Sequence, residues 1–132
     1  MKKDIENRAD LLQLVQAFYV KLLSDDGINY IFTDIAKIDL EHHLPVLVDF
    51  WDMVLFQNNT YQKNALQPHL KLHQQTPFTA NHFRIWLTHF TTTVDDLFEG
   101  EKAFLAKERA TSIATVMQIK MMQQTAASSS DS

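Results

Sequence analysis

The chain has 132 residues but only two glycines and three prolines. An all-β fold needs many tight turns, and glycine and proline supply most of them. Five such residues are too few for an all-β fold, so we expect an all-α protein. Because 45% of the residues are hydrophobic, a chain of this length can bury one core but is too short for two domains.

Charge and composition exclude several classes of function. The formal net charge is −4, so no sequence-wide positive field would attract nucleic acid or an anionic membrane surface. Cysteine is absent, which excludes disulfides, thiolate metal sites and cysteine nucleophiles. The N-terminus lacks the apolar core of a signal peptide, and no apolar run is long enough to span a bilayer. These features predict a cytoplasmic protein, a monomer or weak dimer, with no nucleic-acid or membrane partner.

The first half of the chain contains two apolar repeats of helical spacing. One covers residues 11–23 and carries Tyr19 on its buried flank. A short element at 28–32 follows it and brings Phe32 beside this first helix. This element could cap a pocket.

The second repeat follows Asp39 and places His43 and Leu47 on one helical face. Pro45 complicates this helix, because proline removes a backbone hydrogen bond in a helix interior but is tolerated in the first turn. The helix could therefore start as late as His43.

The second half of the chain begins with a short apolar segment that carries His69. Thr79 is then expected to cap a long helix rich in aromatic residues, including Trp86. Gly100 is expected to lie just past the end of that helix.

The last helix is expected to run from about Glu101 to Met122. Residues 123–132 are mostly small and polar, and they cannot bury enough apolar surface to become ordered. The sequence therefore predicts a single domain over 1–122 and a disordered C-terminal tail.

Four polar ring side chains, Tyr19, His43, His69 and Trp86, each lie on an apolar helical segment. Spread over four helices, they could converge on one buried ligand, and this pattern suggests a haem pocket. Taken singly, an inward Tyr or Trp is more often ordinary core, and a histidine is more often a surface or hydrogen-bonded residue. His69 and His73 have the i, i+4 spacing of a zinc pair, but neither a HExxH arrangement nor a cysteine accompanies them.

Several short motifs, in order, resemble those of the truncated haemoglobins of group III over about residues 8–122. The matches are Phe-Tyr at 18–19, Ile-Phe at 31–32, a histidine seven residues before Phe-Trp at 50–51, His-Leu-Lys-Leu at 69–72, Phe78, and Phe-Arg-Ile-Trp-Leu at 83–87. The glycine motifs of groups I and II are missing here, as they generally are in group III. The resemblance implies a truncated globin, a 2-over-2 helical sandwich around a haem.

The resemblance also implies roles for individual residues. His69 would be the proximal iron ligand, with His73 as its rival. Tyr19, His43 and Trp86 would form the distal, catalytic side, where Pro45 makes His43 the least secure assignment. The apolar residues that would contact the haem are Phe32, Leu47, Phe50, Trp51, Leu66, Leu72, Phe78, Ile113 and Met117.

The implied cofactor is haem b, held without covalent attachment because the chain has no cysteine. The implied ligands are dioxygen, nitric oxide or a related small molecule opposite His69. Two reactions follow from the resemblance, nitric oxide dioxygenation and peroxidase-like chemistry, and the sequence does not choose between them. An unidentified reductase would be the protein partner. Two other classes stay open: a haem-based gas or redox sensor, and a haem-free helical interaction protein whose aromatic residues are ordinary core.

Overall fold

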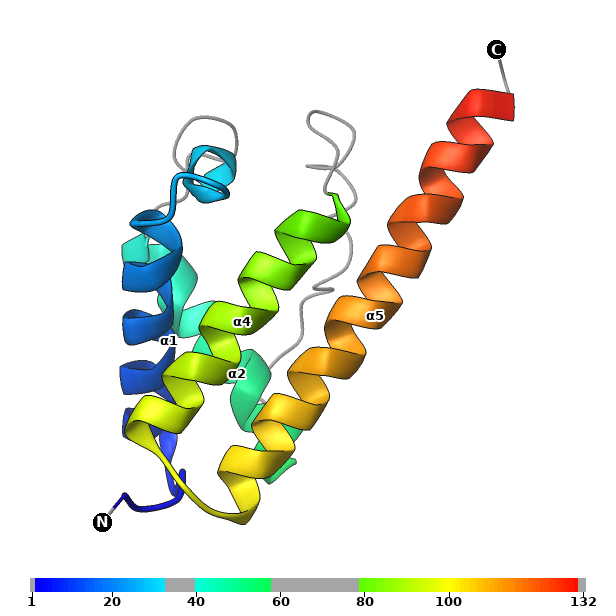
Figure 1. Ribbon diagram of the computed structural model, residues 1–132. Coiled ribbons are helices and arrows are strands. Elements are labelled where there is room, and N and C mark those ends of the chain that lie inside the picture. Colours follow the sequence, from blue (N-terminus) through cyan, green and yellow to red (C-terminus); the bar gives the residue numbers. More distant parts are fainter. Residues whose placement is uncertain (1, 33–39, 58–78, 131–132) are drawn as a thin grey trace.

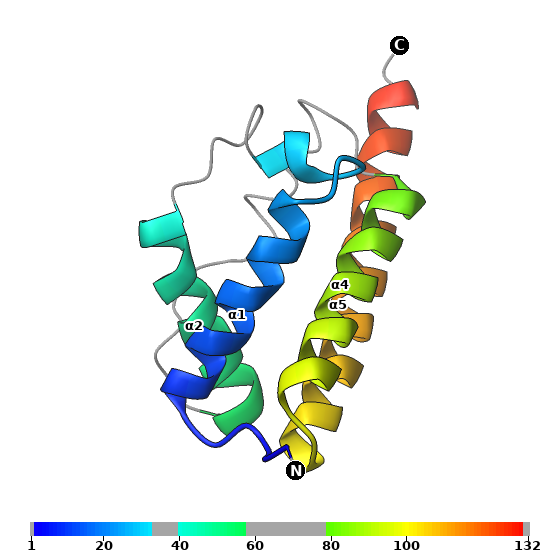
Figure 2. The ribbon, with the colours of Figure 1, turned by 60° about the vertical axis from the view of Figure 1, so that its left-hand side comes forward.

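The computed structural model describes residues 2–32, 40–57 and 79–130. Within these ranges the protein is all-α, with helices α1 (Arg8–Leu23), α2 (Leu40–Phe56), α4 (Ala80–Leu97) and α5 (Glu101–Ser130). Helices α1 and α2 form one antiparallel pair, and α4 and α5 form the other (Figure 1, Figure 2). The pairs meet through contacts of α1 with α4 and of α2 with α5. This arrangement confirms the predicted two-over-two helical sandwich.

The core lies between the two helix pairs. Leu11, Leu14 and Leu22 of α1 are fully buried, as are Phe90 and Val94 of α4. Burying a side chain of this kind contributes about 1.5–3 kcal/mol each. On α5, small side chains form the buried face, which lets the helix approach its neighbours closely: Ala103, Ala106, Ala110 and Ala114. Among the described residues, no helix is both long and apolar enough to cross a membrane.

Helix α2 begins at Leu40 and contains Pro45. The expectation that it could start as late as His43 is therefore wrong. The missing N–H of Pro45 costs the bond to the carbonyl of Glu41, which lies in the first turn. Because only one bond near the end of the helix is lost, the helix continues through the proline.

Helix α5 extends past its expected end near Met122 and reaches Ser130. Residues 123–130, predicted to be disordered, therefore have helical backbone. Neither glycine nor proline occurs between Glu101 and Ser130, so nothing in the chain stops the helix from propagating. Figure 1 shows its last turns projecting beyond the other helices. The division into a domain over 1–122 and a tail over 123–132 stays a prediction.

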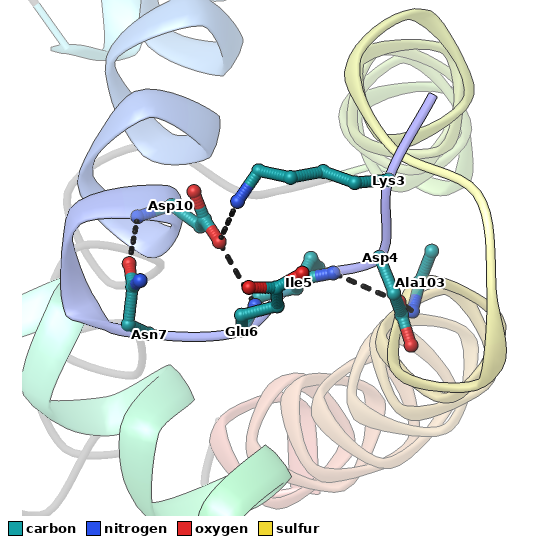
Figure 3. Close-up of polar contacts among 7 residues, drawn as sticks. All are labelled: Lys3, Asp4, Ile5, Glu6, Asn7, Asp10 and Ala103. Atoms are coloured by element: carbon teal, nitrogen blue, oxygen red, sulfur yellow. Dashed lines mark hydrogen bonds and ion pairs between the residues drawn. The ribbon is translucent and has the colours of Figure 1, made fainter. Parts of the chain in front are cut away.

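The N-terminal segment ties α1 to the start of α5 (Figure 3). The Asp4 carboxylate accepts hydrogen bonds from the backbone N–H groups of Lys102 and Ala103, each at 2.8 Å. Asp4 thus acts as an N-cap from the opposite end of the chain. Gly100 has a φ of +147°, and a Cβ atom there would come within 2.5 Å of Cγ of Asp4. Only glycine fits this corner.

Candidate functional site

Tyr19 on α1 and His43 on α2 form the polar centre of the site. The Tyr19 hydroxyl lies 2.9 Å from Nε2 of His43, and the two rings meet edge to face. Tyr19 is only 6% exposed. Burial raises the pKa of its hydroxyl, because a phenolate would lose its hydration. Tyr19 therefore keeps its proton at physiological pH and remains a hydrogen-bond donor.

This hydrogen bond can form in two directions. Either the Tyr19 hydroxyl donates to an unprotonated Nε2 of His43, or a protonated Nε2 donates to the hydroxyl oxygen. In the second arrangement the hydroxyl proton can turn toward a third group in the pocket. His43 can therefore set the direction in which Tyr19 donates, and α2 brings it within reach despite Pro45.

Aromatic side chains surround this pair. Phe32 meets Tyr19 edge to face, with ring centroids 5.7 Å apart, as expected from its place after the first helix. Phe18 lies between Tyr19 and Trp86, with centroids 5.6 Å and 5.7 Å away. Trp86 is half-buried on α4. The structure thus brings Tyr19 and His43 into direct contact, whereas Trp86 is joined to Tyr19 through Phe18.

Phe18 received no role of its own from the sequence. The signal was present, because it precedes Tyr19 and belongs to the apolar repeat of the first helix. Adjacent helical residues point about 100° apart, so Phe18 faces the core while Tyr19 faces the flank. Its position between the rings of Tyr19 and Trp86 depends on how α4 packs against α1. The apolar repeat of the first helix does not specify this packing.

The predicted wall residues of α2 lie on two different faces. Leu47 and Phe50 are half-buried and share a face with His43. Trp51 is only 4% exposed and stacks on Phe90 of α4, with centroids 4.9 Å apart. The structure thus places Trp51 in the core between α2 and α4, and its contact with a haem stays a prediction.

On α5, Ile113 and Met117 are half-buried and lie one turn apart, on a helix that also contacts α2. The remaining predicted site residues lie outside the described ranges: Leu66, His69, Leu72, His73 and Phe78. The proximal side of the pocket, including the iron ligand, therefore stays a prediction.

A second hydroxyl–imidazole pair joins Tyr30 to His82, with 2.9 Å between the hydroxyl and Nε2. His82 also completes a capping box with Thr79. The Nδ1 atom of the His82 ring accepts a hydrogen bond from the Thr79 backbone N–H. The backbone N–H of His82 donates to the Thr79 hydroxyl. The sequence predicted Thr79 as an N-cap but gave His82 no role. His82 lies three residues after Thr79, at the position whose side chain closes a capping box, and this spacing could have indicated its role.

Known proteins of similar sequence and fold are globins. The sequence profile of the bacterial-like globins matches residues 4–125. The chain belongs to this family. It is 29% identical to the group 3 truncated haemoglobin ctb of Campylobacter jejuni over 121 residues, 89% of this chain and 93% of the relative. The fold matches the crystal structure of the group III truncated haemoglobin from Campylobacter jejuni with a TM-score of 0.80 and 27% identity, covering 92% of this chain and 95% of that one.

These findings confirm the predicted resemblance to the truncated haemoglobins. Membership of the globin family implies a haem cofactor and small diatomic ligands. The described residues of this globin fit the distal side of such a pocket. A buried hydroxyl bonded to an imidazole offers polar contacts to a small ligand, and half-buried apolar side chains on α2 and α5 suit the face of a macrocycle.

Proposed function

We propose that this globin binds haem b through His69 and reversibly binds dioxygen, or a similar diatomic molecule, beside Tyr19, His43 and Trp86. The observation that carries this proposal is the buried Tyr19 hydroxyl, 2.9 Å from Nε2 of His43. When bound, the haem supplies an iron that takes the ligand and exchanges electrons.

The protein's own contribution is directional hydrogen bonding. The Tyr19 hydroxyl keeps its proton and donates to the ligand, while His43 holds the hydroxyl in position. The indole N–H of Trp86 is a donor only, so it favours a ligand with partial negative charge on its oxygen atoms. Such donors stabilise bound dioxygen more than carbon monoxide, which carries little charge on its oxygen.

The apolar surroundings strengthen these hydrogen bonds. Phe18 and Phe32 pack edge to face on Tyr19 and exclude water from its ring. A hydrogen bond in such a low-dielectric site is stronger than the same bond in water. The pocket is thus suited to slow release of a polar ligand.

The Tyr19–His43 pair also supports oxygen chemistry beyond binding. An imidazole bonded to a hydroxyl can take up and return a proton, which peroxidase-like reduction requires of the distal side. Nitric oxide dioxygenation transfers both oxygen atoms to nitric oxide without a proton and would use the same side chains only as hydrogen-bond donors. We propose these as the reactions of the site, in a cytoplasmic setting and with a reductase as partner.

Replacing Tyr19 with Phe tests the donor role. The lost hydrogen bond to a partly charged oxygen is worth ~1.5–3 kcal/mol, so we expect dioxygen to dissociate roughly 10- to 100-fold faster in stopped flow. Tyr30→Phe is the matched control, because Tyr30 is a half-buried tyrosine that bonds His82 instead. An unchanged dissociation rate in Tyr19→Phe, or an equal increase in both variants, would contradict the proposal.

The visible spectra of the haem-supplemented protein test the cofactor. We expect stoichiometric haem uptake and ferrous and carbonmonoxy spectra typical of histidine ligation in the wild type. The His69→Ala variant should lose those spectra while keeping its helical circular dichroism. A folded wild-type protein that takes up no haem would favour a haem-free helical interaction protein.

A further inference from the structure

Three aromatic rings from α2 and α4 form a parallel stack in the core. The rings of Trp86 and Phe90 lie 5.9 Å apart at an interplanar angle of 9°. The rings of Phe90 and Trp51 lie 4.9 Å apart at 17°. Phe90 is fully buried and Trp51 is 4% exposed, so water is excluded from these two rings, whereas Trp86 is half-buried.

This parallel geometry differs from that of the neighbouring aromatic contacts. Phe18 meets both Trp86 and Phe90 edge to face, at 79° and 88°. Edge-to-face contacts satisfy the ring quadrupoles but bring little π overlap. The parallel rings are offset, but they turn their π faces toward one another, which favours electron exchange over an edge contact.

The three rings differ in how readily they lose an electron. An indole is readily oxidised by one electron, whereas a phenyl ring is not. Phe90 can therefore act as a bridge between two oxidisable groups, Trp86 and Trp51. The stack starts at Trp86, which Phe18 links to Tyr19, and it ends at Trp51 in the core, away from the half-buried face that carries His43.

We propose that the stack of Trp86, Phe90 and Trp51 carries an oxidising equivalent out of the distal pocket when hydrogen peroxide is reduced there. This inference rests on the proposed haem binding. Reduction of hydrogen peroxide to two water molecules consumes two protons from solvent and two electrons. One electron comes from the haem iron and the other from the indole of Trp86.

An electron from Trp51 then crosses Phe90 and restores Trp86. The net result is two water molecules, a haem and a Trp51 that have each lost one electron, and an intact Trp86. The relay thereby protects the donors that the site needs, Tyr19 and Trp86, from irreversible oxidation.

The test uses ferric, haem-loaded protein treated with hydrogen peroxide in the absence of a reducing substrate. Peptide mass spectrometry then measures oxidation of each tryptophan, and freeze-quench electron paramagnetic resonance detects the tryptophan radical. We expect oxidised Trp51 in the wild type, in spite of its burial, and none when haem-free protein receives the same peroxide. In Phe90→Leu, oxidised Trp51 should fall several-fold while oxidised Trp86 and Tyr19 rise.

Phe98→Leu is the matched control. It also removes a buried ring from the same core, 3% exposed, but Phe98 belongs neither to the parallel stack nor to the distal site, so Trp51 oxidation should match the wild type. The relay is refuted if the haem-loaded wild type shows no oxidised Trp51, or if Phe90→Leu and Phe98→Leu lower it equally. Haem content is measured first in every protein, so a failure to bind haem counts against the proposed function and is distinct from a failed relay.

Trp51→Phe provides a second variant should Phe90→Leu fold poorly. It keeps a ring at the end of the stack but removes the oxidisable indole. Oxidation of Trp86 should then rise several-fold at the same peroxide dose. Unchanged Trp86 oxidation would overturn the relay.

Discussion

His82 bonds through both of its ring nitrogens. Because Nδ1 accepts from the Thr79 backbone N–H, the neutral ring carries its proton on Nε2 and donates to the Tyr30 hydroxyl. Burial lowers the pKa of His82, since the charged ring would lose hydration. Protonation would also make Nδ1 of His82 a donor that faces the Thr79 backbone N–H. It would place a positive charge at the N-terminus of α4, where the helix dipole is unfavourable for a cation.

This geometry predicts a stability that depends on pH. As the pH falls below the ordinary histidine pKa of 6.5, the unfolded chain takes up a proton at residue 82 before the folded protein does. The unfolded state then binds more protons, so the free energy of unfolding falls on acidification. We expect His82→Gln to show a smaller loss of stability between about pH 7.5 and about pH 5 in urea titrations.

Glutamine suits this test because its side-chain carbonyl can accept the same Thr79 N–H without titrating. Thr79→Ala is the control for the cap itself. It should lower stability by about 1 kcal/mol at every pH and leave the pH dependence in place. Equal slopes in wild type and His82→Gln would show that His82 is not responsible.

At the scale of the elements, Asp4 governs the start of α5. Burial raises the pKa of its carboxyl, but backbone N–H groups of Lys102, Ala103 and Ile5 donate to it and lower the pKa overall. We expect Asp4→Ala to reduce the free energy of unfolding by about 1–2 kcal/mol, as loss of an N-cap does. Chemical denaturation followed by circular dichroism measures this change.

Two further variants separate the cap from other effects. Asp4→Asn keeps one oxygen acceptor but turns its amide NH2 toward the other backbone N–H of α5, so it should recover only part of the stability lost in Asp4→Ala. Asp26→Ala removes an exposed carboxylate in the turn after α1 and should change stability by less than about 0.5 kcal/mol. If Asp4→Ala and Asp26→Ala behave alike, the bonds from Asp4 to α5 contribute little.

Contacts between residues close in the sequence could be predicted, whereas contacts between different helices could not. Thr79 was predictable as an N-cap, because its partner His82 lies three residues away. Asp4 was not, because its partners on α5 lie at the other end of the sequence. The sequence suggested that Tyr19 and His43 could converge on one ligand but not that they bond each other, since neither residue's own helix determines how α1 and α2 pack. Trp51 could be placed on a buried stripe, but the stack with Phe90 requires the position of α4.

At the scale of the whole molecule, three parts of the chain meet at one end of the sandwich. The N-terminal segment bonds the backbone of Lys102 through Asp4. The Lys102 ammonium group donates to the carbonyl of Leu55, at the C-terminal end of α2. The chain leaves α2 there toward the segment that carries His69 in sequence. These bonds join the N-terminal segment, the start of α5 and the C-terminal end of α2.

Haem binding should then stabilise the whole globin, because the cofactor binds the folded protein and covers half-buried side chains such as Leu47 and Phe50. With free haem ~1,000-fold above Kd, linkage adds about 4 kcal/mol, which in a chain of this size raises Tm by on the order of 10 °C. Circular dichroism melts of haem-free and haem-loaded protein measure the shift. His69→Ala should lose most of it and His73→Ala should keep it, because the family resemblance predicts His69 as the iron ligand. The reverse result would make His73 the proximal ligand, and equal shifts in both variants would mean that neither histidine carries the coupling between haem and fold.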